Sequence, residues 1–209
     1  MPGSIAFLAD GRRAVVIGIS RQLVGERAFG THGFRYCGSL LASGHRLFDR
    51  GDEVAGIARA LAAAVTEEFG LVGLNGLDFV VRTGIPYPIE VNPRYSASME
   101  LVERSTGASI FGMHEQACAG TLSEEPHAPR AVFGKAVVFG RRAMTISEPG
   151  LRADFAIADV PHPGERIGRG RPICTVFAEG RDADECRKRL VREAERVYRA
   201  VEPRVRGAA

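Results

Sequence analysis

The sequence predicts an α+β protein, in which an antiparallel sheet with packed helices is followed by a small β-rich module and a terminal helix. Two apolar runs joined by Asp10-Gly11 predict a β-hairpin, because this dipeptide favours a two-residue turn. Apolar residues at helical spacing predict an amphipathic helix over residues 52–69. Apolar residues spaced three or four apart among charged ones predict a further helix, from Asp182 to about Val201, at the end of the chain.

The first part of the chain alternates strand and helix patterns. The first hairpin has arms at residues 4–9 and 14–20, and residues 33–41 form another strand candidate. Gly70 then provides a stop for the amphipathic helix. The inward face of that helix carries Val54, Ile57, Leu61 and Val65. A second hairpin follows, with arms at residues 77–82 and 87–91 joined by a turn at Thr83-Gly84.

The second part of the chain begins after a proline-rich linker. Two short helices are expected before the linker, ending near Gly107 and at Gly120. The segment 121–130 contains two prolines and mixed charge, so we place a boundary near residue 128 and expect units at 1–128 and 129–209. Three strands and the final helix are expected after the boundary, at residues 131–139, 143–147, 173–178 and 182–201.

The composition argues against several classes of protein. The chain has 209 residues, with 28 basic and 25 acidic side chains, and a net charge of +3. This balance argues against a nucleic-acid or membrane-surface partner, and no apolar run reaches the ~18 residues that span a bilayer. The four cysteines are widely spaced and form no CxxC motif, so we expect buried free thiols in a cytoplasmic, reducing compartment.

Polar residues alternate along the second arm of the later hairpin. Glu90, Asn92 and Arg94 are two apart, so they project from the same face of a strand, and the preceding arm brings Asp78 near them. Two carboxylates and an amide oxygen form the kind of site that magnesium prefers. Arg94 adds a fixed positive charge suited to phosphate. Spacing alone leaves an alternative open, a surface hairpin in which Glu90 and Arg94 simply pair.

The stretch "GLVGLNGLDFVVRTGIPYPIEVNPRYSASMELVERSTG" resembles the metal-binding end of the ATP-grasp ligases, the superfamily that includes biotin carboxylase. In that pattern, an acidic residue on one strand is followed about a dozen residues later by Glu-x-Asn-x-Arg. The resemblance implies that Asp78 and Glu90 are ligands of Mg²⁺ (or Mn²⁺) and that Asn92 binds a second ion. It makes Arg94 a contact to the phosphates of ATP, with Glu90 and Arg94 acting in catalysis.

The resemblance also implies an activity. ATP-grasp ligases use ATP to convert a carboxylate into an acyl phosphate, which an amine or other nucleophile captures. We therefore expect a small-molecule carboxylate and a nucleophile as substrates. Gly76 and Ser98 depart from the pattern of some relatives, since they stand where those have an arginine and a glutamate, and bicarbonate is disfavoured as the substrate.

The resemblance covers the catalytic half of such a ligase together with a C-terminal β-module. We expect the chain alone to bind ATP weakly and not to ligate, and we expect its first strand to lie at a sheet edge. An N-terminal half or partner subunit would complete it. The alternatives are a non-catalytic nucleotide-binding module and one subunit of a split ligase, and a homodimer is open as well.

For several other polar residues, the sequence allows two interpretations. Gln22 either faces the site or lies on the surface, and Tyr95, Ser96 and Glu100 are candidates for a substrate pocket. Ser96 or Ser98 equally fits a helix cap. The segment "GERIGRGRP" precedes a strand and not a helix, so a turn-rich β-corner is preferred to a phosphate loop. The histidines at 32, 45 and 114 have no partners at metal-ligand spacing and are taken as structural.

Overall fold

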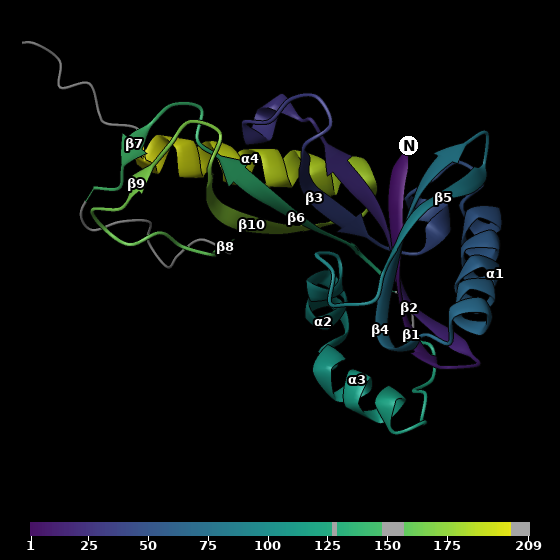
Figure 1. Ribbon diagram of the computed structural model, residues 1–209. Coiled ribbons are helices and arrows are strands. Elements are labelled where there is room, and N and C mark those ends of the chain that lie inside the picture. Colours follow the sequence, from purple (N-terminus) through teal and green to yellow (C-terminus); the bar gives the residue numbers. More distant parts are fainter. Residues whose placement is uncertain (127–128, 148–156, 202–209) are drawn as a thin grey trace, which may run out of the picture.

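The computed structural model describes residues 1–126, 129–147 and 157–201 (Figure 1). Its main element is an eight-stranded antiparallel sheet of order β5-β4-β1-β2-β3-β6-β10-β8, accompanied by a two-stranded sheet of β7 and β9. The strands are β1 (Pro2–Asp10), β2 (Ala14–Val24), β3 (Tyr36–Leu41), β4 (Val72–Arg82), β5 (Ile85–Asn92), β6 (Val132–Phe139), β7 (Met144–Thr145), β8 (Ile157–Ala158), β9 (Arg166–Ile167) and β10 (Pro172–Gly180). The helices are η1 (Arg27–Phe29), η2 (Gly44–Arg46), α1 (Gly51–Phe69), α2 (Met99–Thr106), α3 (Ile110–Cys118) and α4 (Ala183–Val201). The predicted α+β class is confirmed.

The first hairpin forms at the predicted turn. Gly11 has a φ of 90°, and the Asp10 carboxylate accepts the backbone N–H groups of Arg12 and Arg13 at 3.1 and 2.8 Å. The backbone N–H of Arg13 is the main cause that lowers the pKa of Asp10 to about 2. The strand β2 continues past the predicted residue 20 to Val24, because its second half pairs with β3.

The expectation that the first strand lies at a sheet edge is wrong. The strand β1 pairs with β2 on one side and with β4 on the other, and β5 and β8 end the described sheet. The cause is the crossover through α1, which carries the chain over the sheet and returns it as β4 beside β1 (Figure 1).

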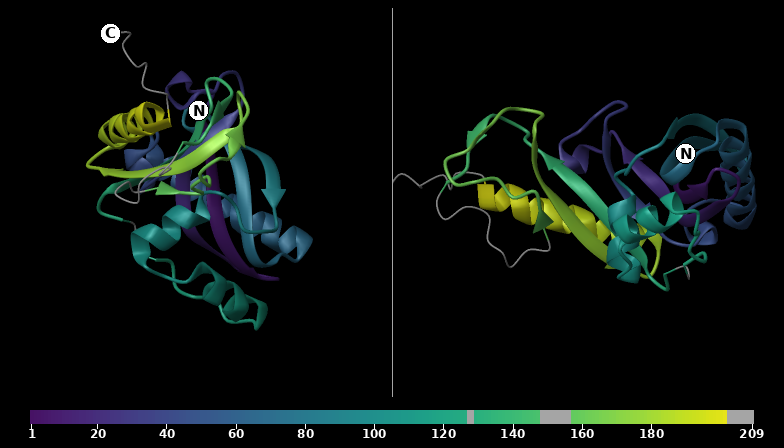
Figure 2. Two further views of the ribbon diagram at one scale, coloured as in Figure 1. Left: turned by 90° about the vertical axis from the view of Figure 1, so that its left-hand side faces the viewer. Right: turned by 60° about the horizontal axis from the view of Figure 1, so that its bottom comes forward.

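Helices cover both faces of the sheet. Alternation along β1 places Ile5 and Phe7 in one core, with residues of α1 and α4, and Ala6 and Leu8 in a second core, with residues of α2 and α3. Figure 2 shows the four helices around the sheet from two further directions. Each of the two faces therefore has its own apolar core.

The predicted helix ends are also observed. Gly70 ends α1 with a φ of 60°, and its N–H donates to the Thr66 carbonyl. Gly107 ends α2 in the same way. The predicted inward face of α4 is confirmed, since Leu190, Ala194 and Val197 are fully buried and Val201 nearly so. None of the helices in the described part of the chain is long and apolar enough to cross a membrane.

The sheet continues across the segment in which we expected a boundary. The strands β3 and β6 pair from Gly38↔Ala136 to Leu41↔Phe133. The expected boundary near residue 128 itself falls outside the described residues, and the division into 1–128 and 129–209 stays a prediction. The segment "GERIGRGRP" forms β9, a turn and the start of β10, which confirms the β-corner.

Candidate functional site

The two predicted carboxylates lie opposite each other on neighbouring strands. Asp78 of β4 pairs with Glu90 of β5, next to a register shift between Asp78 and Phe79. On its other side, Asp78 pairs with Ser4 of β1. Directly opposed residues have Cβ atoms about 4.5–5.5 Å apart and project from the same face. The antiparallel sheet thus brings together three polar side chains from positions 4, 78 and 90.

Hydrogen bonds link the remaining predicted residues to Glu90. The Asn92 side-chain amide donates to Glu90 Oε1 at 3.0 Å, and Arg94 Nη2 donates to Asn92 Oδ1 at 3.0 Å. Arg94 Nη1 donates to the Tyr95 carbonyl at 3.2 Å. The surface-hairpin alternative requires a direct pair between Glu90 and Arg94. The two side chains do not pair directly, because the amide of Asn92 lies between them.

These residues share one open cavity of about 230 Å³. Asp78 and Asn92 are half-buried, whereas Glu90 and Arg94 are exposed. The cavity walls come from β1, β2, β3, β4, β5 and the segment before α2. The lining residues are Ser4, Gln22, Tyr36, Ser39, Asp78, Glu90, Asn92, Arg94, Ser96, Ala97 and Ser98.

Gln22 faces the site, because its side-chain amide donates to Asp78 Oδ1 at 3.2 Å. The sequence analysis missed three polar residues of the same cavity, Ser4, Tyr36 and Ser39, and the apolar Ala97. Ser4 could have been found as a polar residue in an otherwise apolar strand. The Tyr36 hydroxyl lies 2.9 Å from Ser39 Oγ, and burial raises the pKa of Tyr36 to about 12. Tyr36 therefore stays a neutral hydroxyl at physiological pH.

The residues that were expected to line a substrate pocket do not all reach this cavity. Ser96 and Ser98 both line the cavity, and Ser98 stands at the N-cap position of α2 without a side-chain cap bond. Tyr95 is not among the lining residues and donates to Glu103 Oε2 at 3.1 Å. Glu100 points to Lys135, whose ammonium donates to it at 2.9 Å, and does not line the cavity.

The oxygen atoms that the cavity offers as metal ligands fit a hard divalent cation. Asp78 and Glu90 each use one carboxylate oxygen in the hydrogen bonds above, so Oδ2 and Oε2 remain as ligands. Magnesium is held by one or two carboxylates, with water and substrate phosphate completing its shell. Within the described residues, no group of three or more His, Cys, Asp or Glu side chains offers a complete cage for an ion such as zinc.

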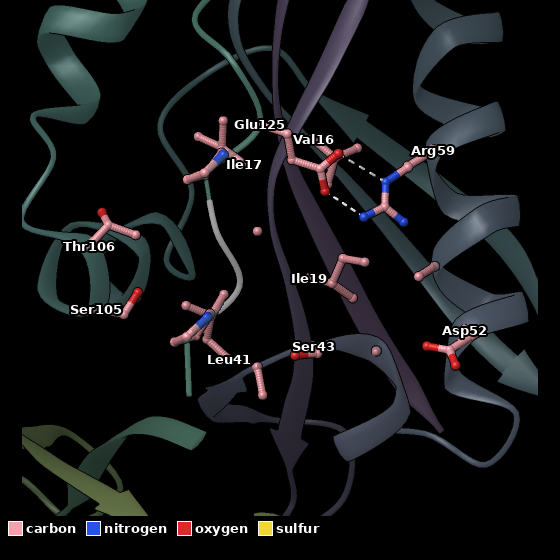
Figure 3. Close-up of a pocket in the computed structure, with 16 residues that line it drawn as sticks. Val16, Ile17, Ile19, Leu41, Ser43, Asp52, Arg59, Ser105, Thr106 and Glu125 are labelled. Atoms are coloured by element: carbon pink, nitrogen blue, oxygen red, sulfur yellow. Dashed lines mark hydrogen bonds and ion pairs between the residues drawn. The ribbon is translucent and has the colours of Figure 1, made fainter. Parts of the chain in front are cut away.

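A second cavity lies at the other end of β2 and β3 and has a different character. It measures about 280 Å³ and is lined largely by apolar residues, among them Val16, Ile19 and Leu41. Arg59 of α1 and Glu125 pair across it (Figure 3). Its other carboxylate, that of Asp52, lies 3.6 Å from His45 Nδ1, so this cavity does not bring two free carboxylates together as the first one does.

One cysteine differs from the expectation of buried thiols. Cys37, Cys174 and Cys186 are buried, but Cys118 is exposed near the end of α3. Cys118 is the last residue of α3, and its sulfur lies near the His114 ring and Gly73 of β4 but is still reached by solvent. His114, one turn earlier, accepts the Leu74 N–H at 3.1 Å, which agrees with its structural assignment.

The comparisons with known sequences agree with this geometry. Residues 1–98 match the family model described as the ATP-grasp domain. An uncharacterized protein of Methanocaldococcus jannaschii is 30% identical over 119 residues, which are 55% of this chain and 28% of that protein. The formate-dependent phosphoribosylglycinamide formyltransferase of Thioalkalivibrio sulfidiphilus is 30% identical over 148 residues, 67% of this chain and 36% of the relative. The chain thus spans about a third of the length of these relatives.

Solved structures share the fold at low sequence identity. The L-amino acid ligase from Bacillus licheniformis superposes with a TM-score of 0.69 at 15% identity, covering 93% of this chain and 50% of that one. The phosphoribosylglycinamide synthetase from Anaerococcus prevotii also gives 0.69, at 12% identity, covering 96% of this chain and 52% of the other. The sequence match identifies residues 1–98 as an ATP-grasp domain, and the solved structures share the fold of the described chain.

Proposed function

We propose that the chain carries the metal- and phosphate-binding part of an ATP-dependent ligase that activates a carboxylate as an acyl phosphate for attack by an amine or another nucleophile. The observation that carries the proposal is the direct pairing of Asp78 with Glu90, beside Asn92 and Arg94, in one cavity. ATP-grasp proteins typically use ATP with Mg²⁺. The two free carboxylate oxygens and the guanidinium group supply what such a ligand needs.

The residues have separate roles in this proposal. Magnesium and ATP, when bound, supply the phosphoryl group that activates the acid. Asp78 and Glu90 hold the metal through carboxylate oxygens, and Asn92 adds an amide oxygen. Arg94 offsets the negative charge of the phosphates, which a planar guanidinium can contact through two N–H groups. Gln22 orients the Asp78 carboxylate, since it occupies Oδ1 and leaves Oδ2 for the metal.

Titration with ATP, with Mg²⁺ present or chelated, tests the assignment. Glu90→Gln and Asp78→Asn remove the ligand charge with little change in shape. Loss of one charge-assisted contact is worth about 1.5–3 kcal/mol, so the magnesium-dependent part of ATP affinity is expected to fall at least about tenfold. Glu68→Gln, at an exposed position of α1, is the matched control and should bind as the parent does. ATP affinity that is indifferent to chelation, or tight zinc binding with no effect of magnesium, would overturn the proposal.

A second candidate function, one part of a ligase completed by another region or subunit, is favoured by the surface around the site. The hairpin that carries Asp78 and Glu90 also exposes Val80, Ile85, Tyr87 and Ile89. Exposed apolar residues grouped in this way are typical of a covered surface. The chain spans 28% and 36% of its two sequence relatives, and we propose that the remainder of such a ligase covers this hairpin. Magnesium-dependent ADP release by this chain alone, with a carboxylate substrate, would contradict this candidate.

A further inference from the structure

A basic cleft lies next to the cavity that contains Asp78 and Glu90, which we call the oxygen-rich cavity. The loop between β2 and β3 forms it together with the turns at residues 140–141 and 169–170, and its volume is about 710 Å³. The lining includes Arg27, Arg35, Arg141 and Arg169 and contains no Asp or Glu. None of these four guanidinium groups forms an ion pair with a carboxylate of the described residues, although other arginines of the chain do.

Two of the four arginines are held in place by packing. Arg35 Nη1 donates to the Gly170 carbonyl at 2.6 Å, and its guanidinium lies 5.2 Å from the centre of the Phe139 ring. Arg141 Nη2 donates to the Ala28 carbonyl at 3.3 Å, and its guanidinium lies 3.7 Å from the centre of the Tyr198 ring. A guanidinium has five N–H donors, so each group keeps donors for a ligand while its direction is already set.

The loop that carries this cleft is itself tightly fitted. Gly25 and Gly30 have φ angles of 67° and 78°, in the region that favours glycine. A side chain at Gly25 would overlap the Gly33 carbonyl oxygen, and one at Gly30 would overlap the Phe139 carbonyl oxygen. The Thr31 hydroxyl closes the loop by donating to the Glu26 carbonyl at 3.0 Å. The loop that carries Arg27 and Arg35 therefore has a fixed backbone before a ligand binds. Less conformational entropy is then lost on binding.

A fully exposed aromatic residue stands at the rim. Phe34 has a relative exposure of 101%, the highest among the large apolar residues of the described chain. Its neighbours in sequence are Gly33 and Arg35, and it lines the same cleft. An aromatic ring beside a group of guanidinium forks offers an apolar surface next to an anion site.

We propose that this cleft binds a small phosphorylated organic molecule, with the phosphate between the arginine forks and the organic part against Phe34. A phosphate dianion has more acceptor oxygens and more charge than a carboxylate, and it matches several guanidinium groups at once. The site is independent of the function proposed for the other cavity. Arg35 lines the cleft and the next residue, Tyr36, lines the oxygen-rich cavity, so the two sites adjoin without sharing a residue.

A fluorescent reporter makes the proposal testable without magnesium. The chain contains no tryptophan, so Phe34→Trp places a single indole at the rim. Ribose 5-phosphate, inorganic phosphate and ribose are titrated with a chelator present, which keeps the metal site out of the measurement. We expect a saturable change with ribose 5-phosphate and none with ribose. Binding of the ester should be tighter than that of inorganic phosphate, and equal binding of the two would overturn the proposed contact between the organic part and Phe34.

Charge-matched variants separate a site from general attraction. In the reporter background, Arg27→Ala with Arg169→Ala removes two unpaired cleft arginines, and Arg12→Ala with Arg192→Ala removes two exposed arginines elsewhere. The first pair should weaken ribose 5-phosphate binding at least about tenfold, because charge-assisted contacts are lost, and the second less than about twofold. Equal weakening by both pairs, or no saturable response, would overturn the proposal. Tighter binding of a single-stranded oligonucleotide than of ribose 5-phosphate would overturn it too.

Discussion

Replacing Gly134 with alanine probes how closely α4 packs on the sheet. A Cβ at Gly134 would lie 2.7 Å from Cys186 Sγ, 2.8 Å from Leu40 Cδ2 and 2.9 Å from Leu190 Cδ1. Real Cβ atoms do not approach so closely, so these side chains, or α4 with them, have to shift. Overpacking of this kind costs about 1–3 kcal/mol, and the restricted unfolded chain returns about 0.4–1 kcal/mol. We expect Gly134→Ala to lower the free energy of unfolding by about 1–2 kcal/mol.

The same contact predicts a compensating pair. Leu190 is fully buried in α4, and Leu190→Ala alone should cost about 2–5 kcal/mol. In the double variant, the methyl group added at position 134 occupies part of the space that the leucine leaves. The double variant should therefore be more stable than the sum of the single effects by at least about 1 kcal/mol.

Urea unfolding followed by far-UV circular dichroism measures this coupling. Gly134→Ala combined with Ile110→Ala is the control, because Ile110 lies in the core under α2 and α3 and does not contact the added methyl. The control pair should be additive within about 0.5 kcal/mol. Additivity of Gly134→Ala with Leu190→Ala would refute the reasoning, since it would mean that α4 is not pressed against β6.

Three further predictions follow from local contacts. Arg181 is the main cause that lowers the pKa of Glu185 from 4.5 to about 2; this stabilisation is present above pH 4.5 and is lost as the pH falls towards 2, so Glu185→Gln should lower the urea midpoint at neutral pH and not at pH 2. Cys118 should be alkylated in the native protein while the three buried thiols, two with a pKa raised to about 12 by burial, react only after unfolding, as mass spectrometry would count. Gly25→Ala should lower the melting temperature by calorimetry, costing more than about 1 kcal/mol, because it combines a positive φ with overlap at the Gly33 oxygen.

Local sequence patterns predicted the helices, strands and turns of this fold better than they predicted which strands lie side by side. The turn at Asp10-Gly11 and the stop at Gly70 depend on a few adjacent residues, so both were visible in the sequence. The position of β1 in the middle of the sheet was not, because it depends on where the chain returns after α1. Strand order is set by contacts between distant segments, and these leave no periodic signal.

In the candidate site, too, contacts within a hairpin could be predicted and contacts between distant segments could not. Asp78 and Glu90 could be paired from the sequence because a hairpin connects them. Tyr36 and Ser39 reach the cavity from β3, which is separated from β4 by the two strands β1 and β2, and no local pattern marks them. The basic cleft was hidden for the same reason, since its arginines come from positions more than a hundred residues apart.

The pairing of β3 with β6 has a consequence for shortened forms of this protein. Removing everything after residue 128, by proteolysis or by design, would leave β3 paired with β2 only, with its other edge unpaired from Gly38 to Leu41. It would also uncover Leu40, which is fully buried in the intact chain. A bare strand with apolar side chains is a template for pairing with other molecules. Fragments that end there should therefore precipitate or form insoluble deposits, and fragments that extend through α4 should remain in solution.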